Sequence, residues 1–121
     1  DRTLPFFARY KGKIIGYIIG VPIENFKSES WAKYDINLGK NNTLYTYAFV
    51  ICKKHRKSGG YAKTLKRIYI NWAKKQKYNY VTGHVEQGIA NRFPNNTEIV
   101  KVFPDWYGLT TPFEYYRRSL S

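Results

Sequence analysis

The residues with the clearest capacity for chemistry form one run, from Cys52 to Leu65, in which a strand ends, glycines turn the chain, and a helix begins. Gly59 and Gly60 permit a turn that other residues resist. The first amide groups of a helix lack partners within the helix and lie at the positive end of its dipole, which is the usual geometry for binding phosphate. Basic residues surround this turn at Lys53, Lys54, Arg56, Lys57 and Lys63. The run therefore predicts a site for a phosphorylated ligand.

Two common phosphate-binding patterns are absent from the sequence. No Gly-Lys-Ser or Gly-Lys-Thr occurs, which excludes the P-loop pattern, and the dinucleotide pattern of three spaced glycines also fails. The run instead fits a shorter pattern, in which arginine or glutamine is followed by two residues, glycine, one residue, and then glycine or alanine. Lys57 takes the first place, Gly60 the fourth and Ala62 the sixth.

This pattern resembles motif A of the GNAT superfamily of N-acetyltransferases, whose loop and helix N-terminus hold the pyrophosphate of acetyl-CoA. The apolar residues before the motif, the Ala62-x-x-Leu65 start of the helix and the glycine-flanked hairpin at residues 12–20 are similar to the family's pattern as well. The resemblance implies an α/β (α+β) fold with a mixed central sheet and a strand-helix-strand core that binds acetyl-CoA. It also implies that residues 1–121 form a single acetyltransferase-like domain, a fragment without the family's first strand and first helices.

The resemblance implies an N-acetyltransferase that uses acetyl-CoA as co-substrate, in which an amine attacks the thioester directly. Such an enzyme works mainly by positioning its reactants and by acid–base catalysis. The pantetheine arm would lie against residues 47–52, and the amine could belong to a small molecule or to a protein. The residues implied to bind acetyl-CoA are Phe49, Val50, Ile51, Cys52, Lys57, Ser58, Gly59, Gly60, Tyr61, Ala62 and Lys63.

The general base is not defined by the pattern, because Thr46 stands where some relatives carry a glutamate. Glu24, His84 and Glu86 are the alternatives. His84 and Glu86 lie at the carboxyl end of a predicted strand, where an α/β sheet opens into its ligand crevice. We therefore expect His84 and Glu86 to be the catalytic pair, with Glu86 as the base.

The acid that would protonate the leaving thiolate is also open. The family's tyrosine falls in a short helix where this chain has Phe93 and Pro94, and the alternatives are Tyr107, Tyr115 and Tyr116, of which we select Tyr107. No metal site is expected, because two histidines and one cysteine are too few.

Hydrophobic patterning predicts the elements that position these residues. The predicted strands are residues 5–10, 14–21, 44–52, 78–85, 97–103 and 112–120, with an amphipathic helix at 60–77 and a short helix at 87–93. The second half of strand 44–52 is apolar on both faces, which is typical of a strand buried on both sides, and Cys52 is expected to be buried at its end. Residues 22–42 are expected to form an ordered loop that Trp31, Tyr34 and Ile36 anchor.

Length and charge limit the function further. The 121 residues suit one domain, and 43% hydrophobic residues exclude a disordered chain. The formal charge of +13 predicts a polyanionic ligand, which leaves a non-catalytic nucleic-acid-binding module as the alternative to the transferase. No long apolar run predicts a transmembrane helix, so a soluble, cytoplasmic protein is expected.

Overall fold

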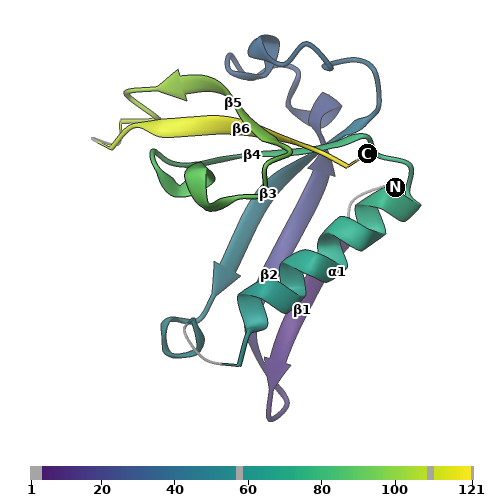
Figure 1. The fold of residues 1–121 in the computed structure, drawn as a ribbon, viewed down its shortest axis with the longest axis vertical. Coiled ribbons are helices and arrows are strands. Elements are labelled where there is room, and N and C mark those ends of the chain that lie inside the picture. Colours follow the sequence, from purple (N-terminus) through teal and green to yellow (C-terminus); the bar gives the residue numbers. More distant parts are fainter. Residues whose placement is uncertain (1–3, 57–58, 109–110, 121) are drawn as a thin grey trace.

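The structure is a computed structural model that describes residues 4–56, 59–108 and 111–120. Its strands form one six-stranded sheet in the order β1-β2-β3-β4-β6-β5 (Figure 1). The strands are β1 (Leu4–Tyr10), β2 (Lys13–Pro22), β3 (Thr43–Ile51), β4 (Tyr80–Glu86), β5 (Thr97–Phe103) and β6 (Phe113–Ser119). The helices are α1 (Tyr61–Lys75) and the short 3₁₀ helices η1 (Ile23–Phe26), η2 (Ala32–Tyr34), η3 (Lys53–His55) and η4 (Ile89–Arg92). This arrangement confirms the mixed α/β class.

The opening hairpin is confirmed. Strands β1 and β2 pair antiparallel, and Lys11 and Gly12 turn the chain with φ angles of 50° and 81°. Both angles are positive, as a two-residue hairpin turn that matches the twist of its strands requires.

The central unit runs from β3 through α1 to β4, and the two strands are parallel as predicted. Their pairing covers only Thr43 to Tyr45 against Tyr80 to Thr82. Beyond these residues β3 continues beside β2 and β4 continues beside β6, so the two strands diverge (Figure 1). We call this opening the split.

The two faces of the sheet carry separate apolar cores. The face under α1 is filled by Ile18, Leu44, Leu65, Tyr69, Ile70, Ala73 and Val81, among others. The opposite face is covered by the loop between β2 and β3 and is filled by Ile23, Trp31, Ala32, Tyr45 and Tyr115. Neighbouring residues on β3 thus serve different cores, since Leu44 faces α1 and Tyr45 faces the loop.

The loop at residues 22–42 is ordered, as predicted, but polar contacts hold it as much as apolar ones. The buried carboxylate of Asp35 accepts hydrogen bonds from Tyr115 and Arg117 of β6, at 2.6 Å and 3.1 Å. Trp31 is buried, as an anchor of the loop must be. Tyr34 and Ile36 are exposed, so the prediction that these two residues anchor the loop is wrong. The ion pair between Asp35 and Arg117 fixes this part of the loop, and hydrophobic patterning of the sequence cannot predict such a contact.

The prediction that the second half of β3 is buried on both sides is wrong. Phe49 and Val50 are exposed, because β3 has left β4 at this point and has a neighbour on one side only. Cys52 is exposed as well, just beyond the end of the strand. Helical spacing predicts Ile68 on the apolar face of α1, but Ile68 is exposed and Ile70 is buried. No helix in the described part of the chain is long and apolar enough to span a membrane.

Candidate active site at the split

The glycine turn has the backbone geometry that the sequence predicts. Gly59 and Gly60 have φ angles of 74° and 64°, in the left-handed region that favours glycine. Gly60 is the N-cap of α1, and no described side chain caps that end of the helix. The first amides of α1 therefore remain available to an anion, in the positive field of the helix dipole.

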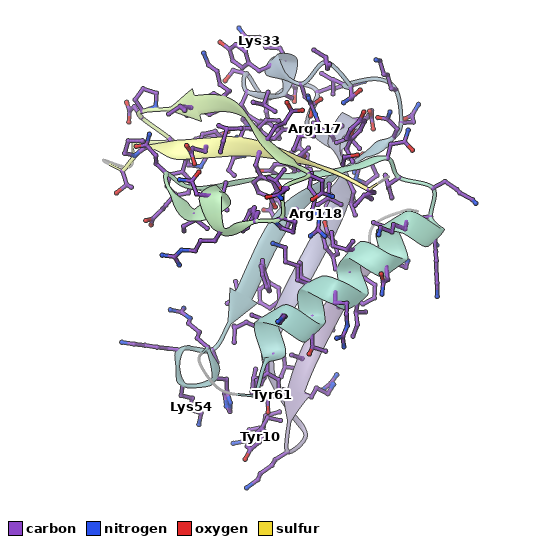
Figure 2. The ribbon with its side chains drawn as sticks, viewed as in Figure 1. Tyr10, Lys33, Lys54, Tyr61, Arg117 and Arg118 are labelled. Atoms are coloured by element: carbon purple, nitrogen blue, oxygen red, sulfur yellow. The ribbon has the colours of Figure 1, made fainter. Side chains whose placement is uncertain are left out.

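The basic side chains predicted around this turn are only partly described. Lys57 and Ser58 lie outside the described residues. Lys53 and Lys54 belong to the short helix η3, and Figure 2 shows Lys54 beside the turn, on the same end of the molecule as Tyr10 and Tyr61. Ala62 and Lys63 follow in the first turn of α1.

A groove of about 490 Å³ extends from this end of α1 toward η4 and β6. We call it the basic groove, since its wall includes the cationic side chains of Lys63, Lys66, Arg67, Lys74, Arg92 and Arg118. Arg118 lies on the α1 side of β6, and its neighbour Arg117 lies on the other side (Figure 2).

Lys66 is the most perturbed of these cations. Its Nζ lies 3.7 Å from the centroid of the Phe93 ring, which is a cation–π contact. Burial and the charge of Arg118 lower the pKa of Lys66 to about 8. A bound anion would oppose both effects, because a nearby negative charge favours the protonated form of Lys66.

The basic groove adjoins a narrow pocket that reaches the split, and Thr46, Phe49, Tyr69 and Tyr116 line this pocket with Lys66. The hydroxyl groups of Thr46 and Tyr69 are 3.0 Å apart. Tyr69 can approach β2 this closely because residue 20 is glycine: a Cβ there would lie 2.5 Å from the Tyr69 hydroxyl. Burial raises the pKa of Tyr69, which therefore stays protonated and can donate a hydrogen bond.

Sequence reasoning missed Lys66, Tyr69, Phe93 and Arg118 as site residues. Helical spacing from Ala62 contained the signal for two of them, because residues 62, 66 and 69 share one side of a helix. The amphipathic pattern puts Tyr69 on the apolar face of the predicted helix and Lys66 on its basic face, and neither placement by itself indicates a site. Arg118 comes from the distant strand β6, and only the sheet order brings it to α1.

A second pocket lies on the opposite face of the sheet, beneath the loop. We call it the aromatic pocket; it has a volume of about 470 Å³ and is lined by Phe26, Glu29, Trp31, Tyr45, Tyr47, Trp106 and Tyr107. Tyr47 is the extra residue of a bulge in β3, because Thr46 and Ala48 pair with consecutive residues of β2. Tyr47 faces Phe26 on the loop side, as Tyr45 does, while Thr46 faces α1. The narrow pocket and the aromatic pocket thus meet β3 from opposite faces at neighbouring residues.

His84 lies behind the aromatic pocket. Its Nδ1 forms a 2.7 Å hydrogen bond with the Tyr45 hydroxyl, and its ring stacks on Trp106 with centroids 3.8 Å apart. Burial lowers the pKa of His84 to about 3, so the imidazole is neutral near neutral pH and accepts a proton poorly.

The other two candidate bases, Glu86 and Glu24, lie on different elements. Glu86 is exposed at the end of β4, one step beyond His84 on the same face. Glu24 is engaged within the loop, where its Oε2 accepts hydrogen bonds from the backbone amides of Gly39 and Asn41. The structure therefore brings His84 and Glu86 to one side of β4 and places Glu24 in a structural role.

The three candidate tyrosines also occupy different places. The exposed Tyr107 donates a 2.6 Å hydrogen bond to Glu29, which raises the pKa of its hydroxyl. Tyr115 donates to Asp35 in the core beneath the loop. Tyr116 lines the narrow pocket on the α1 side.

Comparison with known proteins agrees with this geometry. Residues 1–93 match a family described as the acetyltransferase (GNAT) family. A search of curated proteins gave no match.

Three solved structures illustrate the structural similarity. A ribosomal-protein-alanine N-acetyltransferase from Brucella melitensis is 15% identical with a TM-score of 0.68, over 97% of this chain and 68% of that one. An N-acetyltransferase from Staphylococcus aureus is 14% identical with a TM-score of 0.70, over 98% of this chain and 68% of that one. An aminoglycoside 6'-N-acetyltransferase complexed with coenzyme A is 10% identical with a TM-score of 0.68, over 98% of this chain and 73% of that one. At these identities the likeness shows a common fold.

Proposed function

This chain belongs to the GNAT family of acetyltransferases, which use acetyl-CoA as co-substrate, and we propose that it transfers the acetyl group to an amine acceptor. The observation that carries the proposal is the uncapped amide end of α1 together with the basic groove, which includes Lys63 of the first turn and adjoins the narrow pocket at the split. Phosphates suit the basic groove, and an uncharged chain suits the narrow pocket between Phe49 and Tyr69.

We propose that the cofactor-binding residues are those of the glycine turn together with the basic groove. Gly59, Gly60, Tyr61, Ala62 and Lys63, with Lys57 and Ser58 of the same turn, would hold the pyrophosphate by backbone amides and by charge. The exposed second half of β3, with Phe49, Val50, Ile51 and Cys52, would offer backbone groups to the pantetheine arm. We add Lys66 and Arg118 to the proposed cofactor-binding residues, because both line the basic groove.

In the proposed reaction the nitrogen of the acceptor forms a bond to the thioester carbonyl carbon, and the carbon–sulfur bond then breaks. The amine loses one proton, and the thiolate gains one from solvent. The acceptor would enter from the face of the aromatic pocket, opposite the basic groove. The chain's main contribution is to hold the two reactants on either side of β3.

We assign the acceptance of the proton to Glu86, because the pKa of His84 is too low for an efficient base near neutral pH. His84 would orient the Tyr45 hydroxyl through their hydrogen bond. The leaving sulfur departs on the α1 side, so we assign Tyr69 as its hydrogen-bond donor and Tyr107 as part of the acceptor pocket.

The nucleic-acid-binding alternative has less support. The basic groove is compact and is bounded by residues of α1, η4 and β6, which suits a small phosphorylated ligand. A polymer would instead need cations spread along exposed strands.

The test is to incubate the chain with acetyl-CoA and a panel of amines and to detect N-acetyl products by mass spectrometry. We expect Glu86→Gln to lower kcat/KM by about 10² to 10⁴, the usual contribution of a positioned base, with little change in CoA affinity. His84→Gln serves as the comparison, and the pKa of its pH–rate profile should stay that of the wild type, because His84 is already neutral near neutral pH. Absence of any acetylated amine across the panel would contradict the proposed reaction.

A further inference from the structure

The aromatic pocket differs in charge from the rest of the molecule. The chain carries 21 Lys and Arg against 8 Asp and Glu. Yet among the described residues that line this pocket none is basic, and Glu29 is the charged one. The neighbouring pocket, which shares Trp31, Trp106 and Tyr107, contributes a second carboxylate, Asp105. A cation can therefore enter here without meeting a basic wall, whereas the basic groove behind β3 would repel it.

The rings of the pocket stand at different angles, as the walls of a cage do. Trp31 stacks on Tyr45 with centroids 4.7 Å apart, and its plane is inclined by 60° to that of Trp106. Phe26 and Tyr47 stack at 5.9 Å and form another wall. Aromatic faces are electron-rich, and several of them around one space bind ammonium groups.

Glu29 completes this site. Tyr107 holds its carboxylate by a 2.6 Å hydrogen bond to Oε1, and Tyr107 in turn packs edge to face on Trp106, with centroids 4.6 Å apart. This hydrogen bond places the negative charge beside the rings. Such a carboxylate can pair with an ammonium group that the rings surround.

We infer that the aromatic pocket binds a positively charged ammonium group of the acceptor, and that the acceptor is a small diamine or polyamine. The inference rests on the proposed function and names its substrate class. An amine attacks a thioester only through a free lone pair, and a site that stabilises an ammonium ion removes that lone pair. The group in the pocket is therefore a second amine, which anchors the molecule while the reacting amine reaches the split.

The position and size of the pocket agree with this division. Tyr45 and Tyr47 flank Thr46 on β3, so a short chain anchored among the rings ends beside the split. The volume of about 470 Å³ accommodates a small organic cation with room for its chain.

The first experiment measures binding without acetyl-CoA. Choline and its uncharged analogue dimethylbutanol, in which carbon replaces the nitrogen, are titrated into the chain separately. The two probes differ in charge and share a shape. Trp31 and Trp106 line the pocket, and their fluorescence reports its occupancy. We expect choline to bind about 2- to 30-fold more tightly, the range of one cation–π contact from an exposed to a desolvated site. Equal affinities would overturn the inference.

Variants test whether the rings and the carboxylate provide the discrimination. Tyr47→Leu should lower the affinity for choline by about 2- to 30-fold, and Tyr47→Phe, which keeps the ring, should bind choline as tightly as the wild type. Tyr47 is 62% exposed, so neither change threatens the fold. Glu29→Gln should weaken choline by about 1.5- to 5-fold, as the loss of an exposed ion pair does. Tyr34→Leu, an exposed ring outside the pocket, is the control, and an effect as large as that of Tyr47→Leu would count against the site.

The second experiment separates this inference from the proposed function. Acetylation of putrescine is compared with that of butylamine, and kcat/KM should be about 2- to 30-fold higher for putrescine after correction for its two amines. A preference lost in Tyr47→Leu and kept in Tyr47→Phe supports the inference, and equal rates for the two amines overturn it. A chain that discriminates choline but binds no CoA would contradict the transferase and leave the cation site standing.

Discussion

Replacing His84 by glutamine should make the folded state less sensitive to acid. The imidazole has a pKa of about 3 in the folded protein, against an ordinary value of 6.5. Between these values the unfolded chain binds a proton that the folded protein does not bind. Stability is therefore fully present above about pH 6.5 and is lost as the pH falls toward 3.

The size of the effect follows from the two pKa values. Each pH unit below the unfolded value costs about 1.4 kcal/mol, so at about pH 4.5 the cost for His84 is about 2.7 kcal/mol. A folded pKa one unit higher would change this figure by only about 0.1 kcal/mol, because both values lie below about pH 4.5. The effect is a large part of the stability of a small domain.

The assay is urea unfolding of the wild type and His84→Gln at about pH 7.5 and about pH 4.5. Every other ionisable group is common to the two proteins, so its contribution cancels in the difference between the two pH dependences. His55→Gln, a change of the other histidine, should retain the full pH dependence of the wild type. An equal loss of stability on acidification in the wild type and in His84→Gln would refute the reasoning.

Two further predictions concern charge. Asp35→Asn should cost about 3 to 5 kcal/mol of unfolding free energy, because it leaves Arg117 without its buried partner. Glu98→Gln, which removes the exposed partner of the same guanidinium, should cost less than about 1 kcal/mol, and similar costs for the two variants in urea unfolding would contradict this ranking. Lys66→Gln should lower acetyl-CoA affinity about 10- to 100-fold in calorimetry, and Lys75→Gln, on α1 but outside the basic groove, should leave it unchanged. The affinity of the wild type for acetyl-CoA should fall as the pH rises through about 8, where Lys66 loses its proton. An affinity that does not change with pH across that range would exclude Lys66 from the site.

Local patterns in the sequence predicted the elements and the glycine turn. The helix emerges from the spacing of Leu65, Tyr69 and Ala73, and the turn from Gly59 and Gly60, because both depend on neighbours along the chain. The order of the elements was therefore accessible without the structure.

The exposure of the second half of β3 could not be predicted from local sequence patterns. Phe49 and Val50 have the composition of a buried strand, and only the divergence of β4 leaves them exposed. The aromatic pocket depends on the same kind of distant information, since Trp31 of the loop, Tyr45 of β3 and Trp106 after β5 meet through the sheet order. Sequence reasoning placed His84 near the carboxyl end of its strand, but the burial that lowers its pKa is a property of the packed structure.

The central claim is that acetyl-CoA binds at the amide end of α1 and along the basic groove. The most direct measurement is a calorimetric titration of acetyl-CoA into the wild type, Gly60→Gln and Gly60→Glu. Both variants place a side chain of the same size at a backbone φ of 64°, and they differ in one negative charge at the helix N-terminus. We predict binding to the wild type, weaker binding to Gly60→Gln and none to Gly60→Glu. Equal affinities for the wild type and Gly60→Glu would contradict the claim, as would the absence of binding to the wild type.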